Sequence, residues 1–209
     1  MGEGYAPQAK EISARLELPL KDVAESLREL EDEDVIAFLP RTEELRLAHP
    51  FCASRAPFEV LTERRNWDAI CIWDALGIVV LVDSDGDVST VCPDCRQPIQ
   101  ISVVDGDVNA PVGALVHFGV TVRHWYEDVG YIRANMRLFR SGDDLQQCLE
   151  QGNPRGETMS VERLWNLSRA WYGDRHLPTW KRQSPAEAES LFRSYGLVSD
   201  FWSFGWFFR

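Results

Sequence analysis

The chain has 209 residues, an apolar content of 44% and a formal net charge of −11. This size and composition fit one well-packed core or two small ones. The negative charge disfavours a phosphate backbone as partner, so we expect no nucleic-acid binding. No run of about eighteen apolar residues occurs, so we expect no membrane span. Five cysteines without a secretory signal indicate free thiols in a reducing cytoplasm.

Residues 1–48 are predicted to form a small winged-helix-like module. Apolar residues recur at helical spacing over residues 8–16 and 21–30, and two short apolar runs follow around Pro40. This order of two helices and a hairpin suggests DNA binding. However, residues 1–48 carry six basic and twelve acidic side chains, a net charge of −6. That sign favours a structural or dimerising role over a metal-responsive DNA-binding regulator.

Residues 49–209 are predicted to form a mostly antiparallel β core flanked by helices, so the fold class is α+β. We expect a buried helix over residues 67–77, strands over 87–91, 99–104, 114–122 and 131–139, and helices after Ser141, Ser160 and Ser184. The apolar tail from Phe201 is expected either to pack back on the core or to form a subunit contact, as in a homodimer.

The turn at residues 91–99, Val-Cys-Pro-Asp-Cys-Arg-Gln-Pro-Ile, is the first candidate for chemistry. Its prolines exclude regular helix, and the flanking segments alternate apolar with polar residues as strands do. Cys92 and Cys95 are therefore predicted to lie on a tight turn between two strands, close enough to share one soft metal ion.

Two other interpretations of the turn are weaker. A structural zinc needs four ligands, and the sequence has no second pair of cysteines or histidines at a metal-binding spacing. A thioredoxin-like redox pair should open a helix, whereas a strand is expected here.

Several stretches resemble the organomercurial (alkylmercury) lyase family. Residues 69–76, Ala-Ile-Cys-Ile-Trp-Asp-Ala-Leu, look like a family segment in which a cysteine also lies three residues before an aspartate. Residues 88–99 look like the stretch that carries the family's first catalytic cysteine. Leu138, Phe139 and Ser141 match the strand end after the second catalytic cysteine, and residues 157–162 resemble the start of the family's late helix.

This resemblance implies protonolysis of a carbon–mercury bond. In the family one thiolate binds the mercury, and a second thiol and a carboxylic acid supply the proton. Cys92 matches the first cysteine, whereas the family's acid should lie three residues further, where this chain has Cys95. The second cysteine should fall near residues 133–134, which are Arg133 and Ala134.

Two explanations account for the missing cysteine. Cys95 serves as the second thiol and Asp94 as the acid, which makes Cys92, Asp94 and Cys95 catalytic and Cys92 and Cys95 the metal ligands. Alternatively, the fold is reused for another reaction, and Arg133 binds an anionic group. A non-catalytic thiophilic-metal binder using the same two cysteines is a further alternative.

The expected partners follow from the resemblance. They are a small organometallic substrate, with mercury as substrate or product, and low-molecular-weight thiols or a thiol protein as the metal acceptor. No cofactor is expected.

Overall fold

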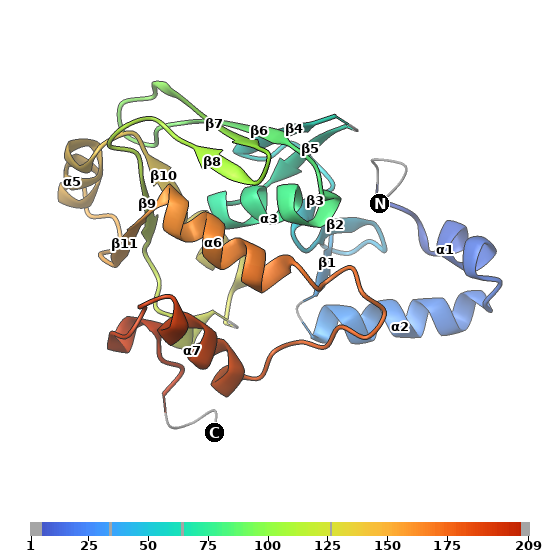
Figure 1. Cartoon of the computed structure of the whole chain (residues 1–209). Coiled ribbons are helices and arrows are strands. Elements are labelled where there is room, and N and C mark those ends of the chain that lie inside the picture. Colours follow the sequence, from blue (N-terminus) through green and yellow to red (C-terminus); the bar gives the residue numbers. More distant parts are fainter. Residues whose placement is uncertain (1–5, 34, 64, 126, 206–209) are drawn as a thin grey trace.

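The computed structural model describes residues 6–33, 35–63, 65–125 and 127–205. Helices and mostly antiparallel strands are combined in an α+β arrangement, as predicted (Figure 1). No helix in these ranges is both long and apolar enough to span a membrane.

A large sheet has the strand order β1-β2-β3-β5-β4-β6-β7-β8, and every neighbouring pair is antiparallel. Its strands are β1 (Ile36–Phe38), β2 (Leu45–Ala48), β3 (Phe51–Cys52), β4 (Phe58–Thr62), β5 (Asn66–Ala69), β6 (Gly86–Val91), β7 (Pro98–Val104) and β8 (Asp107–Asn109). The β6–β7 hairpin pairs Val91 with Pro98, so residues 92–97 form its turn, as the prolines predict.

The N-terminal segment contains two helices, α1 (Ala9–Leu16) and α2 (Leu20–Asp32), followed by the β1–β2 hairpin. This is the expected order of elements. Strand β2 also pairs with β3, so the hairpin continues directly into the large sheet. The winged-helix type and a domain boundary after residue 48 stay predictions.

Helix α3 (Ile72–Val82) lies at the centre of the molecule. Ten of its eleven residues are buried, in keeping with its almost uninterrupted apolar sequence. It packs against β4 and β5 on one side and against α6 (Val161–Tyr172) on another (Figure 1). The first turn of α3 is therefore enclosed by several elements, an environment in which polar side chains are strongly perturbed.

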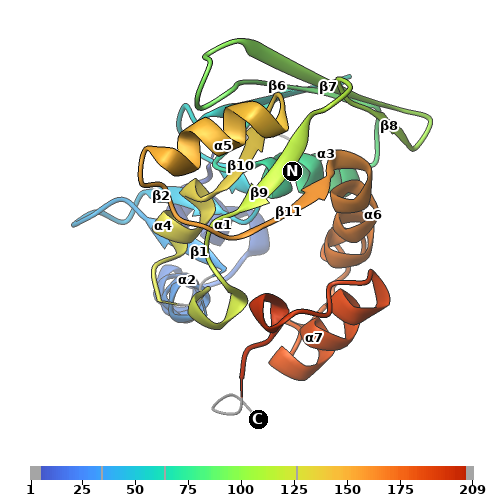
Figure 2. The same cartoon turned by 90° about the vertical axis from the view of Figure 1, so that its left-hand side faces the viewer.

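A second, three-stranded sheet has the antiparallel order β10-β9-β11, formed by β9 (Leu115–Phe118), β10 (Met136–Phe139) and β11 (Glu157–Ser160). Between β9 and β10 lie the 3-10 turn η1 (Val122–His124) and helix α4 (Val129–Ala134). Helix α5 (Gly142–Glu150) follows β10 and lies beside it (Figure 2).

Three predicted elements are wrong in part. Residues 67–69 belong to strand β5 and not to a helix, and they pair with β4. Residues 131–134 belong to α4 and not to a strand. Asp128 caps that helix by accepting a hydrogen bond from the Tyr131 amide at 2.9 Å. The predicted strand over residues 114–122 is also shorter, because β9 ends at Phe118.

The C-terminal part follows the sequence signals closely. Ser184 and Glu187 form a capping box at the start of α7 (Pro185–Ser194), and the 3-10 turn η2 (Asp200–Trp202) follows. Trp202 and Phe204 are each 2% exposed. The described part of the tail therefore packs back on the core, while residues 206–209 lie outside the described residues.

Candidate active site

The first turn of α3 places a thiol and a carboxylate together inside the protein. Cys71 is the N-cap residue, with extended backbone, and its Sγ accepts a hydrogen bond from the Asp74 amide at 3.3 Å. A cap residue and the third helical residue face each other in this way because the first amides of a helix lack partners within it. The sequence Cys-Ile-Trp-Asp over residues 71–74 thus fixes the two side chains side by side.

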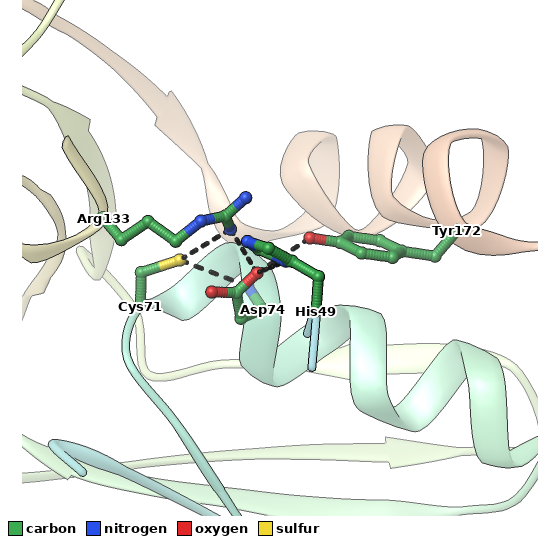
Figure 3. A network of polar contacts seen from close by, with 5 residues as sticks. All are labelled: His49, Cys71, Asp74, Arg133 and Tyr172. Carbon is green, nitrogen blue, oxygen red and sulfur yellow. Dashed lines mark hydrogen bonds and ion pairs between the residues drawn. The ribbon is translucent and has the colours of Figure 1, made fainter. Parts of the chain in front are cut away.

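Asp74 is the centre of a polar network that joins four other residues (Figure 3). Its Oδ1 forms an ion pair with Arg133 Nη1, accepts a hydrogen bond from the Tyr172 hydroxyl at 2.9 Å, and lies 3.4 Å from His49 Nδ1. Arg133 Nη1 also lies 3.8 Å from Cys71 Sγ. Asp74 is fully buried, and its Oδ2 has no hydrogen-bond partner among the described residues.

Gly77, one turn further along α3, makes room for Tyr172. A Cβ atom at position 77 would lie 2.6–2.8 Å from three atoms of the Tyr172 ring. The absence of a side chain therefore lets the ring cross α3 closely and bring its hydroxyl to Asp74.

Burial perturbs the ionisable groups around Asp74. It raises the pKa of the Cys71 thiol, and the Asp74 charge raises it further while Arg133 opposes the change. Burial likewise raises the pKa of Tyr172. It lowers the pKa of His49 well below its usual value, and Arg133 adds to this effect. Desolvation lowers the pKa of Arg133, but the Asp74 charge outweighs it and raises that pKa.

The directions of these pKa shifts favour the thiol form of Cys71, the neutral forms of Tyr172 and His49, and the cationic form of Arg133. Such a concentration of perturbed groups is typical of functional sites.

A pocket opens beside the network and has an empty volume of about 820 Å³, part of which is open to solvent. It is lined by Arg133 and His49 and by tryptophan side chains from several elements. These tryptophans are Trp73, Trp125, Trp171 and Trp180. Trp73 Nε1 and Arg133 Nε are buried without a hydrogen-bond partner among the described residues. The pocket therefore offers aromatic walls together with polar side chains from Arg133 and His49.

The structure also brings Cys92 and Cys95 together, at the β6–β7 turn. Their sulfurs and a carboxylate oxygen of Asp144, in the first turn of α5, all lie within 4.8 Å of one another. A hydrogen bond from the Gln97 backbone lowers the pKa of Cys95, but partial burial and hydrogen bonds with Cys92 and Asp144 outweigh it and raise that pKa.

The predicted acid of the turn, Asp94, is placed differently. Its Oδ1 accepts a hydrogen bond from Gln151 Nε2 at 3.2 Å, so the carboxylate is directed to the end of α5. The carboxylate that joins the two sulfurs is that of Asp144. The catalytic roles of Cys92, Asp94 and Cys95 stay predictions.

The family model of MerB, alkylmercury lyase, matches residues 51–173, which is more than half of the chain. The chain belongs to the alkylmercury lyase family. It is an alkylmercury lyase-like enzyme, in agreement with the prediction. A search of curated proteins found no significant match.

A solved structure of the mercury-bound form of MerB2 has a similar fold, with a TM-score of 0.65 and 16% sequence identity. The match covers 83% of this chain and 82% of that chain. The similarity in fold therefore extends beyond the segment that the family model matches.

Arg133 lies close to where the resemblance to the alkylmercury lyase family predicts the second catalytic cysteine, near residues 133–134. In the structure this residue contacts Cys71 and Asp74, which have the family spacing of cysteine and acid. The spacing of Cys71 and Asp74 is visible in the sequence, but the contact between Asp74 and Arg133 joins residues 59 positions apart in the chain and is visible only in the structure.

Proposed function

We propose that the chain cleaves the carbon–mercury bond of an organomercurial by protonolysis in the pocket beside Cys71, Asp74 and Arg133. One observation carries the proposal. Arg133, at the position expected for the second family cysteine, contacts both Cys71 and Asp74. A cysteine and an acid with the family spacing therefore contact Arg133, which lines the pocket, and this supports the proposal, whereas the carboxylate beside the Cys92 turn comes from Asp144.

The pocket suits a small organic group attached to a metal. Tryptophan rings form its walls, and such rings hold apolar groups through dispersion and the hydrophobic effect. Thiolate sulfur is the preferred ligand of a soft metal, and Cys71 Sγ lies directly behind the Arg133 side chain that lines the pocket. Burial of Cys71 and Asp74 keeps water away from the bond to be cleaved.

The first step is exchange of a metal ligand. The Cys71 thiol bonds to the mercury of R–Hg–SR′, the Hg–SR′ bond breaks, and the thiol proton leaves with the outgoing thiolate as R′SH. The raised pKa of Cys71 means that a thiol, not a thiolate, enters this exchange. Arg133 favours the developing thiolate, because its guanidinium lies 3.8 Å from the sulfur.

The second step replaces the missing family cysteine by an external thiol. A molecule of R′SH bonds to mercury, its proton passes through Asp74 to the carbon, and the carbon–mercury bond breaks to give R–H and Cys71–S–Hg–SR′. Asp74 is suited to carry the proton because its Oδ2 is buried and has no partner among the described residues. Arg133 and Tyr172 hold the other oxygen in place. A further thiol then removes the mercury, so that a thiol serves both as reactant and as metal acceptor.

Metal capture without cleavage, at Cys92 and Cys95, is a second candidate function. It is favoured by the proximity of the two sulfurs, which lie within 4.8 Å of each other. All five cysteines are free thiols, so either function requires a reducing compartment such as the cytoplasm.

Hydrocarbon release distinguishes the two functions. The reduced chain is incubated with phenylmercury or methylmercury and excess thiol, and the protonated hydrocarbon is measured. We expect release from the wild type and from Cys52→Ser, a matched control at a half-buried thiol outside both sites, and none from Cys71→Ser.

Two results would contradict the proposal. Retained turnover in Cys71→Ser together with loss in Cys92→Ser would locate the chemistry at the β6–β7 turn. Tight mercury binding by the wild type without hydrocarbon release would leave capture as the function.

A further inference from the structure

A second cluster of metal-ligating side chains lies outside the Cys71 pocket and shares no residue with it. Cys92 and Cys95 come from the β6–β7 turn of the large sheet, and Asp144 comes from α5, which follows the small sheet. Their three ligand atoms lie within 4.8 Å of one another, although Asp144 is far from the cysteines in sequence. The fold therefore assembles a donor set that no local motif contains.

The two cysteines are held by the closure of the hairpin. The Cys92 amide donates to the Gln97 carbonyl at 2.8 Å, and the Arg96 amide donates to the Cys92 carbonyl at 3.1 Å. Cys92 is fully buried and Cys95 is half-buried. The sulfurs are thus presented by a backbone fixed on both sides, which limits the reorganisation that a metal would require.

Asp144 is fixed independently by the cap of α5. The Ser141 hydroxyl donates to Asp144 Oδ2 at 2.9 Å, and the Asp144 amide donates to the Ser141 hydroxyl at 3.1 Å. A hydrogen bond of this kind behind a ligating carboxylate orients it toward the metal.

We propose that Cys92, Cys95 and Asp144 form a binding site for a resident Zn²⁺ ion, with a fourth position open to water or to an external ligand. Two sulfurs and one carboxylate match the mixed donors that zinc accepts, whereas Mg²⁺ and Ca²⁺ prefer oxygen alone. The sequence disfavours zinc only because it shows two ligands, and the structure supplies a third from a distant helix.

Zinc at this site would link the β6–β7 turn to α5 and would release the thiol protons on binding. Its role would be to fasten the small sheet's helix to the large sheet. This inference does not depend on the proposed lyase activity, because it concerns a different set of residues and a different ion.

The test is zinc binding by the full-length reduced chain after removal of metals by a chelator. Zinc content at equilibrium with a competing chelator gives stoichiometry and affinity. Cobalt substitution adds a spectroscopic signature, a thiolate-to-metal charge-transfer band. We expect one equivalent of zinc in the wild type and a rise in the unfolding midpoint with added zinc.

Four variants make the test specific. Cys95→Ser and Asp144→Asn each remove one ligand at a half-buried position, and we expect each to weaken binding by at least about tenfold. Asp94→Asn and Cys52→Ser are matched controls, because each alters the same chemical group outside the cluster, and both should bind zinc as the wild type does.

Several outcomes would overturn the inference. They are no zinc retained by the wild type, equal binding by Cys95→Ser, no charge-transfer band with cobalt, or loss of zinc in either control. Circular dichroism of each variant verifies folding. If Cys95→Ser is unstable, the zinc affinity of Asp144→Asn, which preserves side-chain size, still tests the site. Zinc binding and hydrocarbon release are measured separately, so failure of one leaves the other intact.

Discussion

Replacing Arg133 by cysteine should restore the second thiol that the family chemistry uses. In the wild type the second sulfur must come from solution, so we expect the first turnover to require external thiol. In Arg133→Cys a sulfur joins the site covalently, at an effective concentration of the order of mM or more. At external thiol well below that level, hydrocarbon release should therefore increase at least about tenfold over the wild type.

Arg133→Cys should also lower the free energy of unfolding, by an amount that follows from the burial of the ion pair. Asp74 is fully buried, and the Arg133 side chain is 16% exposed, so the ion pair is largely desolvated. Removing one partner of such a pair typically costs about 3–5 kcal/mol. In a chain of this size, each kcal/mol lost from the free energy of unfolding lowers Tm by roughly 2–4 °C.

The assay is single-turnover hydrocarbon release over a series of external thiol concentrations, with urea unfolding measured in parallel. Arg133→Ser is the matched control, because it removes the same guanidinium without adding a sulfur. If folded Arg133→Cys keeps the thiol dependence of Arg133→Ser, position 133 does not face the metal, and the proposed site is wrong.

Three further predictions concern the scaffold. Gly77→Ala should lower the free energy of unfolding by about 1–3 kcal/mol in urea titrations, because its Cβ overlaps the Tyr172 ring. Burial, followed by the nearby positive charge, lowers the pKa of His117 to about 4. As the pH falls, His117 is therefore protonated in the unfolded chain before it is protonated in the folded chain. The free energy of unfolding should fall by about 3 kcal/mol from pH 6.5 toward pH 4, and this pH dependence should be weaker in His117→Asn. Glu189 accepts the Phe204 amide at 2.7 Å, so Glu189→Ala should cost about 1–3 kcal/mol in thermal unfolding and release the tail to proteolysis.

Elements with strong local signals could be predicted from the sequence. Ser141, Ser160 and Ser184 each cap the helix that follows them, and Ser184 begins α7 with a capping box. Short apolar segments were less reliable, because residues 67–69 and 131–134 each suit helix or strand by pattern alone. In both cases tertiary packing decides the structure, and only the Asp128 cap offered a local clue to α4.

The candidate site could be predicted only in part, for a physical reason. A cysteine in an apolar segment is most often a core residue, so Cys71 looked ordinary in sequence, whereas two cysteines on a proline-rich turn attracted attention. Cys71 is distinguished by its surroundings in the folded protein. Arg133 from α4 contacts its sulfur, and Tyr172 from the end of α6 contacts the neighbouring Asp74. Tyr172 reaches Asp74 across 98 positions of chain, and no spacing rule connects them.

The two thiol sites differ in their charged neighbours. Cys71 lies beside the Asp74 carboxylate and the Arg133 cation, so a sulfur that bonds to a soft metal there has one neighbour that stabilises its negative charge. Cys92 and Cys95 lie beside the Asp144 carboxylate, which contributes to the raised pKa of Cys95 and complements a divalent cation bound by all three ligands together. A monovalent organometallic cation therefore suits the Cys71 pocket, where Arg133 already balances Asp74, and a bare divalent ion suits the hairpin turn. The two proposals therefore rest on independent features of the same fold, Arg133 beside Cys71 and the Cys92–Cys95–Asp144 cluster at the turn.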